Sequence, residues 1–569
     1  MSDLKFVFKY FKKHITKLII AALLVFTLSL LILPTPLITK DIIDAVLPQK
    51  DLIQLLVYSL ILLFLHLLKN IIGYLQGTLF YKVNATVMFD MRVDLLDKIS
   101  KLQLEVVNKY GAGYFISRIH EDTQKIGSLM ADSLITIIKD IMTIIVGVSA
   151  LFYINYKVAI ISLVLLPLYI ILTIFYSKLL RKKSFIYFEN SANASKQLEE
   201  SLNTIELSKV FVRYDYIVSK YANIAKKKLD SNILLGKINY KGVAATGIIS
   251  GAIPIIILCY GGYEVIHSKL TIGSLIALTA FLGFIIDPLG RLANINGEIQ
   301  QSLVALRRIK TIMGLSEEDL LYKSNKVDSI EKISLDNVSF SYEQKLILDK
   351  INIDILMGEK IGIVGRSGNG KTTLFKILTG LYAINSGEVK VNDVSINIED
   401  LIYMRNFVAV VEQDPVLFND TISNNIKFGT PNATMEEVIE STKKVLINEF
   451  IESLPDKYTT IVERNGTNLS VGQKQKIAIA RALLKKPKIL LLDEVTANVD
   501  NISEEHLSNT VFNLPKDIIV IIIAHRLSTI KKCDKIFVLE DGKLIENGTH
   551  EELLNKKGVY TMLYNRKLG

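Results

Sequence analysis

Six apolar stretches in the first half of the chain are each long enough to cross a bilayer, which takes about 20 residues as a helix. They cover roughly residues 18–38, 52–75, 133–154, 158–178, 243–266 and 271–290. Half of the 569 residues are apolar, and these are concentrated before about position 290. The sequence therefore predicts a multidomain membrane protein with six spanning helices, and not simply a large globule.

The first apolar run follows several lysines, as the apolar run of a secretory signal peptide does. No small-x-small cleavage site comes after it, however, and five more spans follow, so we interpret it as the first span. Residues 1–15 mix aromatic side chains with lysines. This segment is predicted to form an amphipathic helix on the cytoplasmic face of the membrane.

Basic residues are distributed unevenly between the spans. The segment from Lys178 to Lys241 holds 13 Lys or Arg residues, whereas the links on the other side are short and carry few. By the positive-inside rule, both termini and both long loops are cytoplasmic. The formal charge of +10 is explained by this topology, so we expect no nucleic-acid partner.

The two long cytoplasmic loops have the residue pattern of helices. Residues 84–109 and 190–240 show apolar side chains at spacings of three and four with few helix breakers. We expect the spanning helices to continue into the cytoplasm and to turn back at 111–113 and 203–205. Tips of this kind would contact a soluble domain and transmit its movements.

After about residue 320 the pattern changes to strands alternating with helices. An apolar strand at 361–364 and a helix from Thr373 to Tyr382 flank a glycine-rich loop, which is the context of a phosphate loop. We assign phosphate binding to the loop and to Thr373. The loop consists of Gly365, Arg366, Ser367, Gly368, Asn369, Gly370, Lys371 and Thr372. Lys371 is expected to reach the β and γ phosphates, and Thr372 to bind Mg²⁺.

Two further apolar strands end in polar residues. The strand at 489–492 runs into Asp493 and Glu494, and the strand at 520–524 runs into His525. Acidic residues can follow a strand for solubility, and a lone histidine is often structural. Ligands nevertheless bind at the carboxyl edge of such sheets. We therefore predict that Asp493 binds Mg²⁺, Glu494 is the general base and His525 contacts the γ-phosphate.

A Leu-Ser-x-Gly-Gln helix start at 469–473 lies between the phosphate loop and the acidic strand. With these motifs the chain resembles ABC transporters of the exporter type over essentially its whole length. The resemblance implies an interfacial helix (1–15), a six-span α-helical domain with long cytoplasmic extensions (16–310), a linker (311–332) and a nucleotide-binding domain (333–569). The last would be an α/β P-loop ATPase domain with an antiparallel β subdomain and a helical subdomain.

The resemblance also implies roles for residues outside the phosphate loop. Tyr342 would stack on adenine, unless it is a plain strand aromatic. Gln413 would contact Mg²⁺ and the lytic water, and Asp500 would lie in a loop that crosses a dimer interface. Glu463 would sense the cytoplasmic tips, although an exposed Glu is nearly as often only solvated surface.

In the family the signature binds the ATP held by a partner subunit, and here Ser470, Gly472 and Gln473 match it. One phosphate loop, one signature and six spans per chain imply a dimer. Val471 stands where the family usually has Gly, which raises a question about turnover at both sites. The other catalytic positions match, which favours a homodimer over a heterodimer.

The function implied is ATP-driven export by alternating access, with ATP and Mg²⁺ as cofactors, in a bacterial cytoplasmic membrane. The alternatives are a non-transporting sensor, a channel-like protein or one half of a heterodimeric exporter. Drug, lipid and peptide substrates all fit. Ionisable or polar residues in or near the spans either line a cavity or sit at helix ends; they are His66, Lys139, Asp140, Asp287 and Arg291. Asp287 is the best single candidate to face a cavity. The two cysteines predict neither a disulfide nor a metal site.

Overall fold

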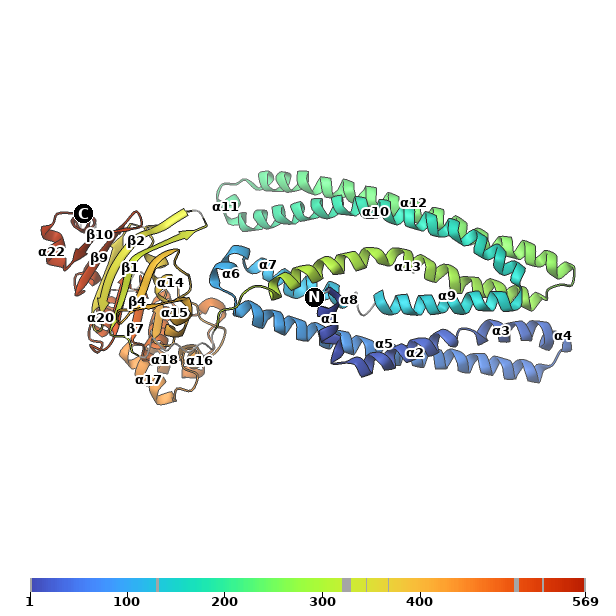
Figure 1. The fold of residues 1–569 in the computed structure, drawn as a ribbon, viewed down its shortest axis with the longest axis horizontal. Helices are drawn as coiled ribbons and strands as arrows, with labels where there is room; N and C mark the ends of the chain where they lie inside the picture. The colour runs from blue at the N-terminus through green and yellow to red at the C-terminus, as the bar shows by residue number, and fades with distance from the viewer. Residues whose placement is uncertain are drawn as a thin grey trace. The chain divides into compact units, whose positions relative to one another are not determined.

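The computed structural model describes residues 3–128, 133–319, 329–343, 345–366, 368–495, 501–523 and 527–566 (Figure 1). The chain folds as two compact units. One consists of Met1–Ser100 and Ala112–Leu315 and is called the helical unit here. The other consists of Lys101–Gly111 and Ser316–Gly569 and is called the α/β unit. Each is described by itself.

The helical unit contains six helical segments that are long and apolar enough to span a membrane within its described residues. These are Ile15–Gln49, Leu52–Ser100, Ile135–Ile154, Tyr156–Asn203, Tyr214–Ile266 and Ile272–Leu292. The described residues thus contain six candidate spans, the number that the sequence predicts. The first segment is built from α2 (Ile15–Leu30), α3 (Pro34–Asp41), a π-helical turn (Ile42–Val46) and α4 (Leu47–Gln49). The other helices of the unit are α1 (Asp3–Lys12), α5 (Leu52–Ser100), α7 (Ala112–Ser117), a π-helical turn (Arg118–Asp122), α8 (Thr123–Ser128), α9 (Leu134–Ile154), α10 (Tyr156–Asn203), α11 (Ile205–Val210), α12 (Tyr214–Ile266) and α13 (Ile272–Met313).

Two helix starts in this unit are set by short polar residues. Asn155 begins α10 by accepting hydrogen bonds from the backbone N–H groups of Lys157 and Val158, at 3.0 and 3.2 Å. Thr271 begins α13 in the same way through the N–H of Ser274. Pro167, Pro254 and Pro288 lie inside helices, where neighbouring helices can satisfy the backbone groups that a proline frees.

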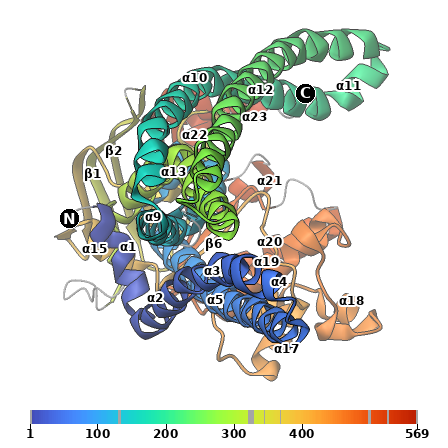
Figure 2. The same ribbon diagram turned by 90° about the vertical axis from the view of Figure 1, so that its right-hand side faces the viewer.

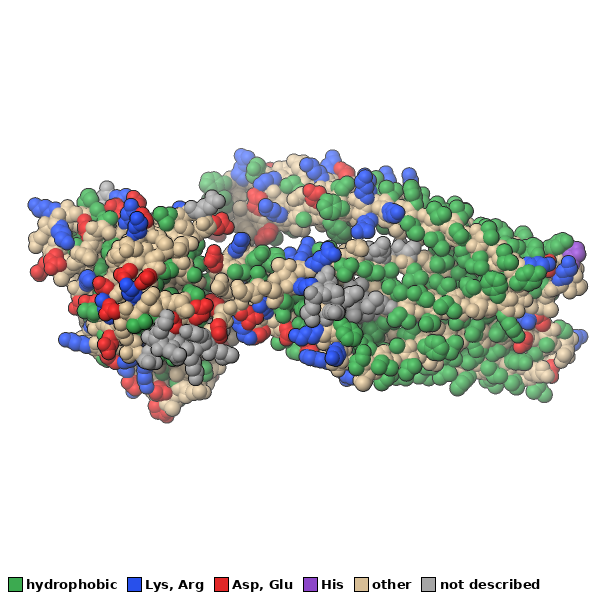
Figure 3. Space-filling view, viewed as in Figure 1, with side chains coloured by type: hydrophobic (Ala, Val, Ile, Leu, Met, Phe, Trp, Pro, Cys, Tyr) green, Lys and Arg blue, Asp and Glu red, His purple; other side chains and the backbone are tan. Residues whose placement is uncertain are grey.

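Helices α10 and α12 run side by side over most of their length (Figures 1 and 2). A buried apolar core joins them to α9 and α13, with Leu278 and Phe281 of α13 among its fully buried side chains. Outside this core, apolar side chains gather over much of the unit's surface, including the exposed Leu56, Leu60 and Phe64 of α5 (Figure 3). Such a surface matches hydrocarbon, not water.

The helical extensions of the spans differ in one place from the sequence-based expectation. The helix predicted over 84–109 is interrupted at Lys101–Gln103, and a separate helix, α6 (Leu104–Tyr110), follows. Residues 101–111 pack with the α/β unit, so the expected tip is a short helix and not only a turn at 111–113. Gly111 has φ +76° at its end. The second tip is α11, which follows a break at Thr204.

The α/β unit contains two sheets. A four-stranded antiparallel sheet has the order β2-β1-β4-β5, and a six-stranded sheet has the order β10-β9-β3-β8-β7-β6. Its strands are β1 (Lys332–Tyr342), β2 (Lys345–Leu356), β3 (Lys360–Gly365), β4 (Ser386–Val391), β5 (Val394–Ile396), β6 (Val408–Val411), β7 (Ile489–Asp493), β8 (Ile519–Ile523), β9 (Lys535–Glu540) and β10 (Lys543–Gly548). The six-stranded sheet is parallel except for the β9–β10 pair.

The central strands of the six-stranded sheet are apolar throughout because both faces are covered. In β8, Ile519, Ile521 and Ile523 belong to one core cluster, while Val520 and Ile522 belong to the other. Parallel strands buried on both faces have this composition. The expectation of buried strands at 489–492 and 520–524 is therefore confirmed as far as Ile523.

Short helices complete the α/β unit. Between β6 and β7 they form a helical subdomain whose apolar side chains, such as Ile426, Val438 and Ile451, pack together with Ile477. The helices of the unit are α6, α14 (Lys371–Leu378), α15 (Ile398–Met404), α16 (Ile422–Lys427), α17 (Met435–Lys444), α18 (Asn448–Ser453), α19 (Val471–Leu484), α20 (Asn501–Phe512), α21 (Leu527–Ile530), α22 (His550–Asn555) and α23 (Val559–Arg566), with 3₁₀ turns at Lys457–Thr459 and Arg464–Gly466. The antiparallel and helical subdomains are both as predicted.

Candidate nucleotide site

Four parallel strands bring most of the predicted site residues to one edge of the six-stranded sheet. In the register, Ile363 of β3 lies beside Ile523 of β8, which lies beside Asp493 of β7. Leu492 of β7 in turn lies beside Val411 of β6. The phosphate loop, the acidic pair and the segment with Gln413 therefore leave the sheet at neighbouring positions, where open α/β sheets bind ligands.

The phosphate loop is shaped by glycines at positions where a side chain would collide. A Cβ on Gly365 would meet the backbone carbonyl oxygen of Leu539 in β9. Gly370, with φ +89°, is the N-cap of α14, and a Cβ there would lie 2.6 Å from Leu348 Cδ2. Gly368 also has a positive φ, +87°. This backbone is the kind that turns N–H groups toward an anion at a helix start.

Lys371 and Asn369 hold the loop in place. The Lys371 ammonium group donates hydrogen bonds to the carbonyl oxygens of Gly365 and Arg366 at 3.0 and 2.9 Å, and the residue is 7% exposed. Asn369 Nδ2 donates to the carbonyl of Leu539 at 3.0 Å. A buried cation is thus fixed against the loop, where it can meet phosphate oxygens. Arg366 is exposed and Thr373 is buried in α14.

Thr372 and Asp493 are in direct contact. The Thr372 hydroxyl donates to Asp493 Oδ2 at 3.2 Å. Burial raises the pKa of Asp493, and the negative charges of Glu494 and Glu412 add to the effect, against the opposing influence of Thr372 and Lys371. A carboxylate held near other acids, next to a hydroxyl oxygen, is a donor set that suits Mg²⁺. The residues present therefore fit the predicted cation.

Glu494 follows Asp493 in an unusual backbone conformation. Its φ is +49°, and its N–H donates to the carbonyl of Ile523 at 2.8 Å. Positive φ in a residue other than glycine is uncommon and often marks a functional position. Glu494 therefore lies just beyond the edge of the sheet, next to Asp493, the last residue of β7.

Tyr342 lies at the end of β1 and is 36% exposed. It contacts Phe340 and Tyr382 edge to face, with ring centroids 4.9 and 5.4 Å apart. The Tyr382 hydroxyl accepts a hydrogen bond of 2.9 Å from Asn108 Nδ2 of α6. Tyr342, which is expected to stack on adenine, therefore packs against Tyr382, and Tyr382 also binds α6 through Asn108.

Gln413 is exposed beyond the end of β6. Its backbone carbonyl accepts a hydrogen bond of 3.4 Å from Nε2 of Gln475, a fully buried residue of α19. The segment after β6 is thereby connected to the signature helix. Glu463 is exposed and accepts a hydrogen bond from Thr467 at 2.9 Å, so its contacts are local.

The signature motif forms a helix start with a complete capping box. The Ser470 hydroxyl accepts from the N–H of Gln473 at 3.3 Å, and the Gln473 side chain accepts from the N–H of Ser470 at 2.8 Å. Val471 is 44% exposed and Gly472 is partly exposed. The box fixes the start of α19, so the next N–H groups, those of Val471 and Gly472, are held in one orientation.

Three predicted site residues lie outside the described part of the chain: Ser367, Asp500 and His525. Sequence reasoning, for its part, missed two groups near the site. Glu412 adds its charge to that of Asp493, and the α6 segment packs Leu104 against the core of the α/β unit. The pairing of Asn108 with Tyr382 spans 274 positions of sequence, and no local pattern signals it.

Comparison with known families gives matches to both halves of the chain. Residues 18–289 match the ABC transporter transmembrane region, and residues 348–497 match the ABC transporter model. The chain belongs to the ABC transporter family. It carries both regions on one chain, the organisation of an exporter-type half-transporter.

Curated relatives of this ABC transporter are exporters and flippases. An ATP-dependent lipid A-core flippase of Desulfotalea psychrophila is 32% identical over 93% of this chain and 93% of its own length. A putative multidrug export ATP-binding/permease protein of Bacillus subtilis is 32% identical over 98% and 97%. The alpha-hemolysin translocation ATP-binding protein of Escherichia coli is 32% identical over 98% and 79%.

A solved structure of a bacterial Atm1-family ABC exporter with ATP bound is also similar, with a TM-score of 0.83, 26% identity and coverage of 97% of this chain and 98% of that one. The fold, family and relatives agree. This transporter is a multi-span membrane protein that binds ATP and couples ATP hydrolysis to transport.

Proposed function

We propose that the protein is an ATP-driven exporter that works as a dimer by alternating access in a bacterial cytoplasmic membrane. Both termini and the α/β unit lie on the cytoplasmic side, as the basic loops indicate. The observation that carries the proposal is the start of α19. It presents anion-binding groups that no hydrogen bond within the described residues of this chain uses.

Among the described residues, the N–H groups of Val471 and Gly472 have no hydrogen-bond acceptor, because the capping box serves only Ser470 and Gln473. A helix start with two available donors attracts phosphate oxygens. In the proposed dimer, Ser470, Gly472 and Gln473 meet the γ-phosphate of ATP held by the partner. ATP is then bound between the phosphate loop of one subunit and the signature of the other.

Within one subunit, the glycine-shaped loop binds the phosphates from Gly365 to Thr373, with Ser367 included, and Tyr342 stacks on adenine. Thr372 and Asp493 would hold Mg²⁺, assisted by Gln413. Mg²⁺ supplies neutralisation of charge on the phosphate oxygens when it is bound. Glu494 accepts a proton from the attacking water, His525 contacts the γ-phosphate, and Asp500 lies at the dimer interface.

ATP binding would drive the conformational change because the closed dimer makes contacts with ATP that the open one lacks. The α6 segment is placed to receive this change, since Asn108 is bonded to Tyr382, which contacts the proposed adenine-stacking Tyr342. The tip α11 is the second candidate contact. The substrate class is a drug, a lipid or a peptide, in line with the names of the relatives.

The test uses purified protein in proteoliposomes and inverted vesicles. Replacing Glu494 by Gln should reduce Mg-ATPase activity by roughly 100-fold or more while ATP still binds. Glu551→Gln, at an exposed acid in the first turn of α22, is the matched control and should keep full activity. Undiminished hydrolysis in E494Q would refute the assignment of the base.

The same sample separates the alternatives. Hydrolysis by the purified chain alone indicates a homodimer, whereas hydrolysis that requires a second, different chain indicates one half of a heterodimer. ATP-dependent accumulation of a labelled solute distinguishes an exporter from a sensor. A passive flux that ATP only gates would identify a channel-like protein.

A further inference from the structure

A pocket of about 500 Å³ lies within the helical unit, between α5, α9, α13 and the end of α2. Its polar lining comes from three helices and includes Lys69, Asn70 and Tyr74 of α5, Lys139 of α9, and Asp287 and Arg291 of α13. The expectation that Asp287 faces a cavity is therefore confirmed. Lys69 was not among the residues that the sequence singled out.

Charge in the pocket is not balanced among the residues that the structure describes. Arg291 forms a two-pronged ion pair with Asp140, at 3.0 and 2.7 Å, and Asp140 is only 1% exposed. Lys69 and Lys139 form no ion pair with any residue that the structure describes. The pocket lining thus carries three positive charges and one negative charge, that of Asp287. Asp140, which lies behind the lining, neutralises Arg291. The net charge of the group is +1.

The three basic residues lie near the same end of their spans. Lys69 precedes the end of the predicted run at 75, Lys139 follows the start of the segment at Ile135, and Arg291 precedes its end at Leu292. At 1.5 Å per residue, each lies within roughly 10 Å of that end. In the proposed orientation this is the cytoplasmic end, the depth of lipid head groups and upper acyl chains.

The remainder of the lining is apolar or open. Leu28, Ile32, Phe284 and Pro288 supply apolar surface. At Gly73 and Gly283 an added Cβ would meet nothing within 4 Å, so these glycines leave free space that packing does not require. The pocket thus combines basic side chains, apolar side chains and unfilled space next to Gly73 and Gly283.

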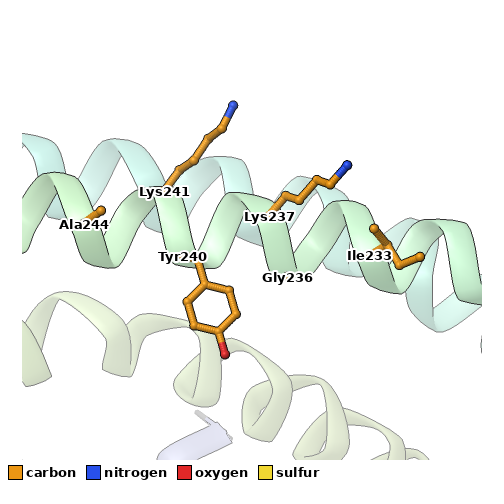
Figure 4. Close-up of a pocket in the computed structure, with 6 residues that line it drawn as sticks. All are labelled: Ile233, Gly236, Lys237, Tyr240, Lys241 and Ala244. Carbon is orange, nitrogen blue, oxygen red and sulfur yellow. The ribbon is translucent and has the colours of Figure 1, made fainter.

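Another hollow in the helical unit is less suitable. Its lining residues, including Lys237, Tyr240 and Lys241, all come from α12. Figure 4 shows the two lysines and Tyr240 projecting from opposite sides of that helix. One helix cannot enclose a ligand, so this surface supports no site.

We propose that the pocket between α5, α9 and α13 binds an amphiphile with an anionic head group, a phosphate or carboxylate, as the transported substrate. Lys69 and Lys139 pair with the head group, and Phe284 and its apolar neighbours contact the hydrophobic body. An unpaired ammonium at membrane depth is costly, and an anion relieves that cost. This inference rests on the proposed export function, because it names the substrate of that function.

Binding is measured without ATP, so that it is tested separately from transport. The full chain is placed in nanodiscs of phosphatidylcholine, and retention of fluorescent phosphatidylglycerol is compared with that of fluorescent phosphatidylcholine. The wild-type protein should prefer the anionic probe, and K69Q/K139Q should bind it at least about tenfold more weakly. The control K178Q changes a lysine near the end of the fourth predicted span that does not line the pocket, and it should bind as the wild type does.

K69R/K139R keeps both charges and should restore binding, which separates loss of charge from loss of folding. A preference for a cationic amphiphile, abolished by D287N, would overturn the inference. So would equal competition by inorganic phosphate, since the site would then hold free anions and not amphiphiles. If K69Q/K139Q loses binding but the wild type shows no ATP-dependent translocation, the pocket stands and the export function fails.

Discussion

The nucleotide site and the pocket of the helical unit differ in how their charged groups are paired. In the first, Lys371 is bonded to carbonyls of its own loop and Asp493 to Thr372. In the second, Asp140 is paired with Arg291, but Lys69 and Lys139 have no ion-pair partner among the described residues. A site whose charged groups are held by their own loop and strands is shaped by backbone and can be recognised as a motif. A site that awaits a ligand is recognisable only once helices far apart in sequence have packed.

The largest expected effect tests whether backbone shape defines the nucleotide site. Gly365→Ala places a methyl group against the carbonyl oxygen of Leu539, and neither backbone can move freely. We expect a loss of about 3 kcal/mol in the free energy of unfolding of the α/β unit and loss of ATP binding. Both are measurable by denaturant unfolding and by titration with a fluorescent ATP analogue.

The control is Gly113→Ala, because a Cβ at Gly113 meets nothing within 4 Å. That variant should unfold and bind ATP like the wild type. Normal ATP binding in G365A would show that the loop tolerates a side chain. The nucleotide site would then not be defined by backbone shape, and its contrast with the pocket of the helical unit would fail.

The next effect tests the pairing in the pocket. Asp140→Asn leaves Arg291 without its carboxylate beside a buried wall. Because Arg291 is partly exposed, we expect a cost of about 2 kcal/mol, less than for a fully buried pair. Thermal unfolding in detergent measures it. Asp287→Asn, at an exposed acid that forms no ion pair with a described residue, should shift the midpoint little; equal shifts in both variants would contradict the assigned pairing.

A smaller effect concerns Asp493. Its pKa is raised by burial, so the folded state takes up a proton at a higher pH than the unfolded chain does. Its ionised form therefore destabilises the nucleotide-free protein, and this penalty disappears as the pH falls through the raised pKa. Asp493→Asn should stabilise that protein at neutral pH by about 1 kcal/mol, by denaturant unfolding without Mg²⁺ or ATP.

The proton should also compete with Mg²⁺. Mg²⁺-dependent ATP binding should weaken on acidification at a higher pH than an ordinary aspartate would predict, and D493N should bind Mg²⁺ weakly at every pH. A wild-type profile that is flat down to the ordinary aspartate pKa, about 3.9, would contradict the raised pKa.

The smallest effect tests the connection between α6 and the aromatic cluster. Asn108→Ala removes the hydrogen bond to Tyr382, worth about 1 kcal/mol or less. Basal ATPase activity should change little, while stimulation by a transported solute should fall if α6 transmits the signal. The control is Asn424→Ala, on α16. Asn70 is not used as a control because it lines the pocket of the helical unit. Full stimulation in N108A would exclude this route.

The sequence predicted those parts that depend on local pattern. The six spans follow from apolar length, and the fully apolar strands β7 and β8 follow from burial on both faces. The phosphate loop and the start of α19 follow from glycine and capping positions. In each case the physical cause acts over a few residues.

Other features depend on contacts between distant residues. The break after Ser100, the pairing of Asn108 with Tyr382 and the pairing of Asp140 with Arg291 join positions more than 100 apart or follow from packing on another unit. Lys69 lies in an ordinary apolar run, and its role in a pocket is visible only when α9 and α13 face it. The roles of Ser367, Asp500 and His525 remain predictions.

The path of the chain between the two units has a practical consequence. The backbone passes from one unit to the other after Ser100, after Gly111 and after Leu315. A protease that cuts only beyond Leu315 would therefore not release a soluble ATPase. Residues 101–111 remain covalently linked to the helical unit, and their packing would hold the cleaved α/β unit in place. Conversely, a domain expressed from Ser316 onward would lack Leu104 and expose the apolar patch that it covers. Adding a peptide of residues 101–111 should improve the solubility of that fragment.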